Sequence, residues 1–229
     1  MLLKNKVAIV TGSAGGIGEA TARQFAAEGA KVIVSDVDVE GGERVVKAIA
    51  DAGGTALFIA ADVSKAEAVQ ALIDGAVEQY GRLDVLVNNA GIGGEQAPVG
   101  DLSVGGWQQV IEINLSGVFY GMKYAIPHML KNGGGAIVNV ASILGAVGTP
   151  GASAYVAAKH GVLGLTQTAA LEYAQQGIRI NAVGPGYIRT PLLEPLLEQE
   201  GVEDMLVSLH PIGRLGQDDE VANFITFLA

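Results

Sequence analysis

A tyrosine and a lysine four positions apart are the residues in this sequence best suited to chemistry. Tyr155 and Lys159 begin a long stretch with helical spacing, so both side chains should lie on one helix face. A phenol with an ordinary pKa of about 10 is too weak a base at neutral pH. A cation about 4 Å away supplies roughly the energy that lowers this pKa by about 2 to 3 units. The pair therefore predicts a general acid–base, although most such pairs are surface contacts.

Ser142 follows an apolar run, residues 136–141, that predicts a buried strand. Ligands bind at the carboxyl ends of the strands in open α/β sheets, so the Ser142 hydroxyl could hold a substrate oxygen beside the Tyr155 phenol. The alternative role for this serine is to cap a turn. The surrounding Val-Ala-Ser-Ile-Leu lacks the G-x-S-x-G elbow of serine hydrolases. The sequence thus favours proton transfer over a serine nucleophile.

A glycine-rich turn, Thr11–Gly18, lies between the first predicted strand and the first predicted helix. Gly12 permits a tight turn, while Gly16 and Gly18 let the backbone approach a pyrophosphate. The helix amino terminus adds N–H donors and a positive dipole. The spacing G-x-x-x-G-x-G differs from the common G-x-G-x-x-G, and no Lys-Ser/Thr pair follows as in a nucleotide-hydrolysing P-loop. The turn predicts a dinucleotide site, although isolated matches can be plain structural turns.

Asp36 ends the second predicted strand. A carboxylate there can accept hydrogen bonds from the adenosine ribose hydroxyls, and it would repel the additional phosphate of NADP. No arginine or lysine lies in the glycine-rich turn or directly after Asp36 to offset that repulsion. The alternative role is a helix cap, since Asp38 is close by. We therefore predict NAD as the cofactor.

Short strand-like runs alternate with helical patterns along the chain. The strands are almost continuously apolar, which is typical of a parallel sheet covered on both faces. Right-handed crossovers would give a doubly wound, Rossmann-like sheet in a three-layer αβα fold. We expect strands at residues 6–11, 31–35, 55–60, 84–87, 136–141 and 178–182. We expect helices at residues 17–28, 41–52, 65–80, 104–131 with a break near 114–117, 153–176 and 218–229.

The composition fits a single domain spanning residues 1–229, of which 49% are hydrophobic. A net charge of −10 argues against nucleic-acid and membrane partners, because such a surface repels phosphates and anionic lipids. There is no cysteine, and no two of the 3 histidines have metal-ligand spacing, so no metal site is expected. The chain lacks a signal-peptide pattern and an apolar run long enough to span a bilayer, which predicts a cytoplasmic protein.

Together the motifs resemble the short-chain dehydrogenase/reductase family over essentially the whole chain. The matching segments are Thr11–Gly18, Asp62-Val63, Asn88–Gly91, Asn114, Ser142, Tyr155 with Lys159, and Pro185-Gly186. The resemblance implies a catalytic tetrad of Asn114, Ser142, Tyr155 and Lys159. In that scheme Tyr155 exchanges the hydroxyl proton and Ser142 polarises the carbonyl. Lys159 lowers the pKa of the tyrosine and binds the nicotinamide ribose, while the Asn114 backbone helps to hold a water.

The resemblance also implies a cofactor site along the carboxyl edge of the sheet, with Asp62 and Val63 at the adenine and Pro185, Ile188 and Thr190 on the nicotinamide side. The predicted cofactor-binding residues are Gly12, Ser13, Gly16, Ile17, Gly18, Asp36, Asp62, Val63, Asn89, Ala90, Gly91, Tyr155, Lys159, Pro185, Gly186, Ile188 and Thr190.

Residues 189–215 correspond to a segment that forms a mobile lid in the family. Its apolar side chains could roof the substrate, although amphipathic packing explains them equally well. We expect a neutral, rather hydrophobic secondary alcohol or ketone, with cyclic compounds among the candidates. The apolar candidates for this pocket are Ile143, Leu144, Val147, Tyr187, Leu192, Leu193, Leu196 and Met205. His160 and His210 are expected to be structural.

The resemblance implies a homodimer or homotetramer paired through the helices before the fifth strand. The apolar side chains expected there are Val110, Ile113, Val118, Phe119 and Met122; packing onto the chain's own sheet is the alternative. Family members usually continue into a seventh strand and a glycine-rich tail. This sequence ends inside the last predicted helix, so the seventh strand is expected to be absent.

Three functions follow from these observations. The first is an NAD(H)-dependent oxidoreductase that interconverts a secondary alcohol and a ketone by hydride transfer. The second is an NADPH-dependent 3-oxoacyl-carrier-protein reductase, against which Asp36 and the acidic surface count. The third is a catalytically silent NAD-binding regulator, against which the complete tetrad counts.

Overall fold

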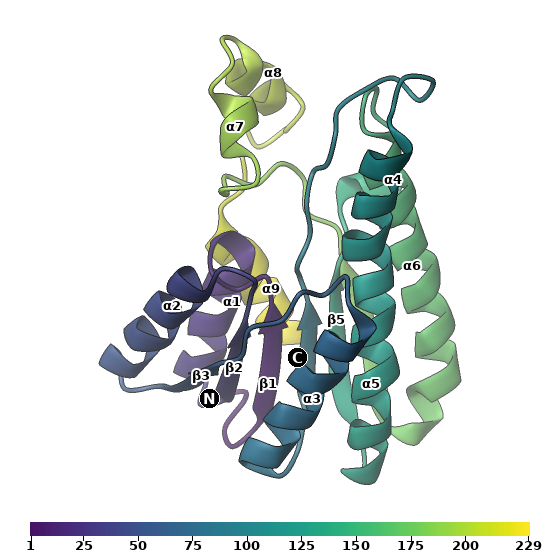
Figure 1. The fold of residues 1–229 in the computed structure, drawn as a ribbon. Helices are drawn as coiled ribbons and strands as arrows, with labels where there is room; N and C mark the ends of the chain where they lie inside the picture. Colours follow the sequence, from purple (N-terminus) through teal and green to yellow (C-terminus); the bar gives the residue numbers. More distant parts are fainter.

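Six parallel strands form one sheet in the order β3-β2-β1-β4-β5-β6 in the computed structural model, which describes all 229 residues (Figure 1). The order reverses direction between β1 and β4, and a crevice for ligands opens at such a switch point. The strands are β1 (Val7–Thr11), β2 (Lys31–Ser35), β3 (Thr55–Phe58), β4 (Val85–Asn88), β5 (Gly135–Val140) and β6 (Ile178–Val183).

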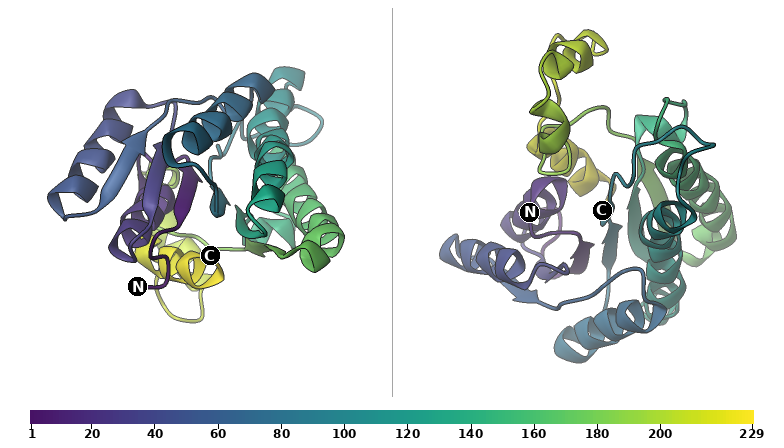
Figure 2. Two further views of the ribbon diagram at one scale, coloured as in Figure 1. Left: turned by 90° about the horizontal axis from the view of Figure 1, so that it is seen from below. Right: turned by 45° about the horizontal axis from the view of Figure 1, so that its top comes forward.

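Helices cover both faces of this sheet (Figures 1 and 2). One face carries α1 (Gly16–Ala27), α2 (Val39–Asp51) and α9 (Asp218–Leu228). The other carries α3 (Ala66–Tyr80), α5 (Gly117–Lys131) and α6 (Ser153–Tyr173), with α4 (Val104–Ile111) continuing above α5. The doubly wound, three-layer fold predicted from the sequence is confirmed. None of the helices combines the length and the apolar character that a membrane span would need.

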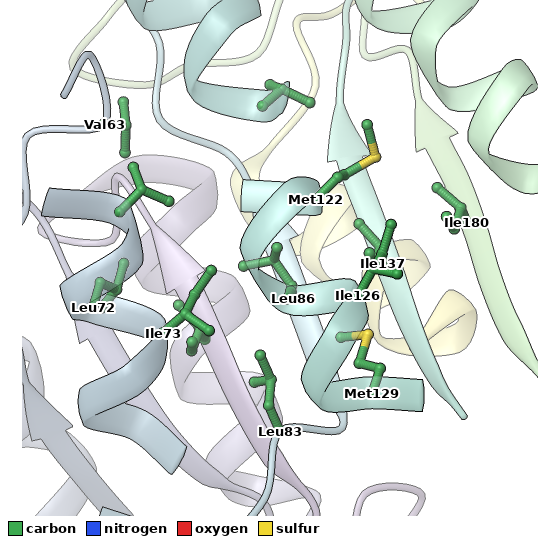
Figure 3. Close-up of a cluster of buried hydrophobic side chains, with 14 of the residues drawn as sticks. Val63, Leu72, Ile73, Leu83, Leu86, Met122, Ile126, Met129, Ile137 and Ile180 are labelled. Atoms are coloured by element: carbon green, nitrogen blue, oxygen red, sulfur yellow. The ribbon is translucent and has the colours of Figure 1, made fainter. Parts of the chain in front are cut away.

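Alternate residues of the central strands enter two separate cores. In β1, Ala8 and Val10 pack with α1, α2 and α9, whereas Ile9 packs with the helices of the opposite face. Figure 3 shows the larger core, in which Leu72 and Ile73 of α3 lie near Leu86 of β4 and α5 side chains. Burial on both faces explains why the strands are continuous apolar runs, without the alternation of a half-exposed sheet.

Local capping moves some ends of the predicted elements. Helix α2 begins at Val39, two residues before the expected start, because the Asp38 side chain accepts a hydrogen bond from the Gly41 N–H at 3.0 Å. The break expected in the long helix before β5 is confirmed as a π-helical turn, Glu112–Ser116, between α4 and α5. Such turns interrupt regular α-helical hydrogen bonding and occur often at functional sites.

The apolar surface expected for subunit pairing is largely core. Val110 is fully buried, and Val118 and Met122 are each only 3% exposed. The prediction is therefore wrong for these three side chains, because they form the inward stripe of α4 and α5. Phe119 does face outward, with 45% of its surface exposed. The homodimer or homotetramer itself stays a prediction.

A buried carboxylate joins β1 and β4 at their amino ends, opposite the switch point. Asp84 is only 3% exposed, and it accepts hydrogen bonds from the Val7 N–H at 2.9 Å and the Arg82 Nε at 2.8 Å. Lys6 Nζ lies 3.3 Å from the same carboxylate. Burial alone would raise the pKa of Asp84, but the Arg82 and Val7 hydrogen bonds and the Lys6 charge hold this pKa below its ordinary value.

We expect Asp84→Asn to lower the free energy of unfolding by about 1 to 3 kcal/mol at pH 7, because the variant weakens several buried hydrogen bonds. A depressed pKa means that the carboxylate stabilises the fold above its unfolded value of about 3.9 and that this contribution disappears as the pH falls through the folded value. The difference between parent and variant should therefore shrink below about pH 4. Urea unfolding across this range measures it.

Asp51→Asn is the matched control, because Asp51 pairs with Lys47 on an open surface where its side chain is 65% exposed. Its effect should stay within about 0.5 kcal/mol. Equal effects of the two substitutions at pH 7 would contradict the role given to Asp84.

Candidate active site

The glycine-rich turn Thr11–Gly18 lies at the switch point, where β1 ends and α1 begins. A Cβ on Gly18 would lie 2.1 Å from the Gly12 carbonyl oxygen, and one on Gly12 would lie 2.7 Å from the Ala90 Cα. Gly12 also has a φ of +62°, which L side chains rarely adopt. The turn, α1 and the loop after β4 thus approach more closely than side chains would allow. The first N–H groups of an α-helix have no partner within the helix, and at this turn those of α1 suit an anion.

The loop after β4 is braced onto this turn by Asn89 and Thr11. Asn89 Nδ2 donates to the carbonyl oxygens of Thr11 at 2.9 Å and Gly12 at 2.8 Å. The Thr11 hydroxyl accepts from the N–H groups of Asn89 at 3.1 Å and Ala90 at 3.2 Å. The sequence predicted that Asn89 and Ala90 contact a cofactor; the structure places both at the crevice, with the Asn89 amide nitrogen committed to the turn.

Ser13 lies in the predicted cofactor turn, but its side chain points into the protein. It is fully buried, its hydroxyl donates to the Val10 carbonyl oxygen at 2.7 Å, and it accepts from the Ser35 N–H at 2.9 Å. These bonds join β1 to β2. Gly16 lies beside Thr190, because a Cβ on Gly16 would be 3.2 Å from the Thr190 Cβ. The two expected cofactor segments are therefore adjacent.

Asp36 lies at the carboxyl end of β2 and faces the glycine-rich turn. Its Oδ2 accepts from the Ala14 N–H at 3.0 Å and its Oδ1 accepts from the Asp38 N–H at 3.1 Å. The helix-capping role belongs to Asp38. Asp62 accepts from the Ser64 N–H at 2.9 Å before α3, and Val63 next to it is almost fully buried. Asp36 is therefore the predicted acidic residue that contacts the glycine-rich turn.

The expected catalytic residues meet at the carboxyl end of β5. Ser142 follows that strand, and Tyr155 and Lys159 lie on the first turns of α6. Tyr155 lies close enough to Ser142 for the serine hydroxyl to lower the pKa of the phenol in part. Lys159 Nζ donates to the Val140 carbonyl oxygen at 2.8 Å and lies 5.5 Å from the centre of the Tyr155 ring. The Ser142 hydroxyl also accepts from the Leu144 N–H at 3.1 Å, so it caps a turn as well.

Asn114, in the π-helical turn, holds the loop after β4 with its side chain. Its Oδ1 accepts from the Ile92 N–H at 2.9 Å and its Nδ2 donates to the Ile92 carbonyl oxygen at 2.8 Å. A Cβ on Gly91 would lie 3.3 Å from the Asn114 Oδ1 and 3.7 Å from the Lys159 Nζ. Asn114, Gly91 and Lys159 therefore converge, and the glycine keeps the space between them open.

The sequence predicted that Lys159 lowers the pKa of Tyr155, and the structure corrects this. Burial raises the pKa of Tyr155, the nearby Ser142 hydroxyl lowers it in part, and Tyr187 raises it. The ammonium donates to the Val140 carbonyl oxygen and lies over the Tyr155 ring, 5.5 Å from its centre. Burial lowers the pKa of Lys159 itself to about 8. The phenol is thus protonated at neutral pH.

The site fits a nicotinamide dinucleotide. The close approach at Gly12 and Gly18 forms a cradle that a Cβ would fill, next to the helix N–H groups that suit a pyrophosphate. A lysine ammonium has three N–H donors, and Lys159 uses one of them on Val140. Its other donors would suit ribose hydroxyls beside Gly91. Such a cofactor supplies hydride chemistry, which the side chains present cannot provide.

The two ends of the predicted lid, residues 189–215, are held side by side by backbone hydrogen bonds. The Arg189 N–H donates to the Gly216 carbonyl oxygen, and the Gly216 N–H donates to Tyr187, both at 3.0 Å. The segment carries α7 (Glu194–Leu197) and α8 (Val202–Ser208), which stand above the carboxyl ends of the strands (Figures 1 and 2). Five of the predicted pocket residues remain exposed, in contrast to a closed apolar roof: Ile143, Val147, Leu192, Leu196 and Met205.

The other residues predicted for the cofactor and substrate sites lie in the segments that follow β5 and β6. The Pro185 carbonyl oxygen accepts from the Ile143 N–H at 2.8 Å, so β6 and the segment after Ser142 are joined. Ile188 packs on Gly216, where a Cβ would lie 2.3 Å from the Ile188 Cδ1. Val147 is exposed, whereas Leu144 and Leu193 are partly buried.

His210 connects the lid to the site. Its Nδ1 lies 2.8 Å from the Leu206 carbonyl oxygen, and its Nε2 accepts from the Tyr187 N–H at 3.1 Å. Because a carbonyl can only accept, these partners define a neutral ring with its proton on Nδ1. The ring also packs edge-on against Tyr187, and a Cβ on Gly186 would lie 2.7 Å from Nε2. The structural role of His210 is thus to join α8 of the lid to Tyr187 in the segment after β6.

We expect His210→Ala to loosen the lid, because the variant loses both hydrogen bonds of the ring and leaves the Tyr187 N–H without its partner. Amide exchange across residues 189–215 should become roughly tenfold faster. Glu203→Gln is the control, since Glu203 pairs with Arg189 on the surface and such pairs contribute little. Similar exchange in both variants would count against the His210 contact.

Sequence reasoning missed one functional candidate, Arg44. This arginine of α2 donates to the Ala14 carbonyl oxygen at 2.8 Å and also contacts Glu19 of α1. Arg44 lies eight residues after Asp36, outside both the turn and the residues directly after that aspartate. The position of Arg44 on a helix that packs beside the turn was the signal that could have found it.

A glycine-rich turn at the switch point of a parallel sheet, with Ser142, Tyr155 and Lys159 beside it, defines a dinucleotide-dependent oxidoreductase of the α/β class. A family model described as enoyl-(acyl carrier protein) reductase matches residues 12–229. The chain belongs to the short-chain dehydrogenase/reductase family, as the motifs predicted, and is an oxidoreductase that uses a nicotinamide cofactor.

Individual relatives are similar over almost the entire chain. The cyclohexanol dehydrogenase of Acinetobacter sp. (strain SE19) is 50% identical over 224 residues, covering 98% of this chain and 87% of that protein. The cis-4-hydroxycyclohexanecarboxylate dehydrogenase of Sinomonas cyclohexanicum is 51% identical over 224 residues, covering 98% and 89%. The crystal structure of levodione reductase matches with a TM-score of 0.95 at 38% identity, covering 99% of this chain and 91% of that one.

Proposed function

We propose that this protein interconverts a neutral cyclic secondary alcohol and its ketone, with NAD as the hydride carrier. The observation that carries the proposal is the gathering of Ser142, Tyr155 and the buried Lys159 at the carboxyl end of β5, beside Gly91 and the glycine-rich turn. Two relatives at about half identity are named for six-membered ring alcohols, which supports a cyclic substrate.

The Ser142 and Tyr155 hydroxyls would hold the substrate oxygen between them. In ketone reduction, Tyr155 donates its phenolic proton to that oxygen while Ser142 donates a hydrogen bond to it. In alcohol oxidation, the Tyr155 phenolate accepts the hydroxyl proton. Lys159 lies beside Gly91 to hold the nicotinamide ribose, and Asn114 fixes the loop that carries Gly91. A nicotinamide cofactor bound there would supply the hydride chemistry at the substrate carbon.

Asp36 supports NAD over NADP. Its carboxylate lies at the end of β2, held by the Ala14 and Asp38 N–H groups, at the position where an acidic residue accepts ribose hydroxyls. A 2′-phosphate there would face this negative charge. This arrangement also counts against an NADPH-dependent 3-oxoacyl-carrier-protein reductase.

The charges of the lid support a neutral substrate. Residues 189–215 contain two cationic side chains, Arg189 and Arg214. Arg189 is paired with Glu203, and Arg214 forms two hydrogen bonds with Glu220. Neither guanidinium is available to neutralise a substrate carboxylate without losing its partner. We therefore favour an unsubstituted cyclic alcohol over a hydroxy acid.

We expect the protein to reduce NAD with cyclohexanol at a higher kcat/KM than with cis-4-hydroxycyclohexanecarboxylate. Tyr155→Phe should lose at least about 100-fold in kcat, because the acid–base group is gone, while its NADH affinity stays near that of the parent. Absorbance of NADH measures turnover, and NADH fluorescence measures binding. Tyr173→Phe removes a hydroxyl from the other end of α6 and should leave kcat close to that of the parent.

Other outcomes identify the competing functions. Equal turnover of Tyr155→Phe and the parent would refute the tyrosine assignment. Preference for NADPH with a 3-oxoacyl thioester would identify the carrier-protein reductase. Tight NADH binding without turnover over a broad panel of alcohols would identify the silent regulator.

The raised pKa of Tyr155 predicts opposite pH dependences for the two directions. Only the phenolate accepts a proton, so kcat/KM for alcohol oxidation should rise with pH through the alkaline range. Ketone reduction needs the protonated phenol, so its rate should stay constant near pH 7 and fall only at alkaline pH. A bell-shaped oxidation profile with its maximum near pH 6 would contradict this assignment, provided that circular dichroism shows a folded protein throughout.

A further inference from the structure

We propose that Glu19 is a positioning residue for cofactor selectivity, because it holds Arg44 away from the 2′ position of the adenosine ribose. Arg44 is then a latent ligand for a 2′-phosphate, and Glu19 keeps it engaged. The inference rests on the proposed use of NAD and adds a second determinant to Asp36.

Arg44 and Glu19 join α2 to the first turn of α1 beside the glycine-rich turn. Arg44 Nη1 donates to Glu19 Oε1 at 2.9 Å, and Arg44 Nη2 donates to Glu19 Oε2 at 2.5 Å. This two-pronged contact matches the geometry with which arginine binds carboxylate and phosphate groups. Arg44 Nη2 also donates to the Ala14 carbonyl oxygen at 2.8 Å.

Arg44 and Asp36 hold the same residue of the turn. The Ala14 N–H donates to Asp36 Oδ2 at 3.0 Å, and the Ala14 carbonyl oxygen accepts from Arg44. The Arg44 guanidinium and the Asp36 carboxylate, which is proposed to bind the ribose, are therefore separated only by Ala14. A 2′-phosphate near Asp36 would be within reach of an arginine released from Glu19.

Glu19 is well placed to hold this arginine. Its side chain is only 17% exposed, whereas that of Arg44 is 53% exposed. Burial tends to raise the pKa of Glu19, but hydrogen bonds from Arg44 and Arg23 keep it below its ordinary value. The carboxylate therefore stays charged across the neutral range. It also lies at the positive end of the α1 dipole, where it reduces the attraction for anions.

Removing the negative charge of Glu19 should favour binding of a 2′-phosphate. Arg23, Glu19 and Arg44 form a triad with two positive charges and one negative charge. Glu19→Gln leaves both cations and removes the carboxylate that Arg44 binds through Nη1 and Nη2. Because the pyrophosphate is common to both cofactors, the ratio of NADPH to NADH affinity isolates the effect at the 2′ position.

The experiment measures dissociation constants for NADPH and NADH by fluorescence, and kcat/KM for NADP and NAD. It compares Asp36→Asn with Asp36→Asn/Glu19→Gln. We expect the double variant to shift both ratios toward the phosphorylated cofactor by roughly tenfold more than Asp36→Asn alone. Adding Arg44→Gln to the double variant should abolish that extra gain, and 0.5 M salt should reduce it.

Glu43→Gln in the Asp36→Asn background is the matched control, because it removes one negative charge from an exposed side chain of α2. The ratio of NADPH to NADH affinity in this control should stay within about twofold of the ratio for Asp36→Asn. The inference is overturned if Glu19→Gln gives no greater gain than Glu43→Gln, or if the gain survives Arg44→Gln. Failure of the parent protein to use NAD would instead overturn the proposed function.

Discussion

The active site depends on one buried cation that joins two layers of the fold. Lys159 of α6 donates to the Val140 carbonyl oxygen at the end of β5, and burial lowers its pKa to about 8. Ser142 lies two residues beyond that carbonyl, and Tyr155 lies one helical turn before the lysine. The contact therefore sets the distance between the strand that carries the serine and the helix that carries the phenol. The same ammonium faces Gly91 after β4, so three elements meet at a single charged group.

The surrounding scaffold fixes both ends of the strands that flank the switch point. At the carboxyl end, Asn89 bonds the loop after β4 to the glycine-rich turn, and the absence of a side chain at Gly18 lets α1 pack against it. At the amino end, Asp84 joins the starts of β1 and β4. The site is thereby built on rigid elements, whereas the segment above it is attached by the Gly216 hydrogen bonds and His210.

The sequence predicted the layers, the strands and the break before β5, because apolar runs and helical spacing report burial directly. It also placed Ser142, Tyr155 and Lys159 together, since strand ends in a parallel sheet share one edge. Sequence pattern could not show that the Ser13 hydroxyl turns inward, that Val118 faces the sheet, or that burial raises the pKa of Tyr155. Each of these depends on solvent exposure and on distances between segments far apart in the chain, and the Arg44 contact with Ala14 does as well.

A crystal structure of the protein with NADH and cyclohexanone bound would test the central claim most directly. The account predicts that the ketone oxygen lies within hydrogen-bond distance of both the Tyr155 Oη and the Ser142 Oγ, with the carbonyl carbon facing the nicotinamide and the ribose hydroxyls bonded to Lys159. A ketone bound with its oxygen directed away from both hydroxyls, or a nicotinamide placed on the far side of Gly91 from Lys159, would contradict it.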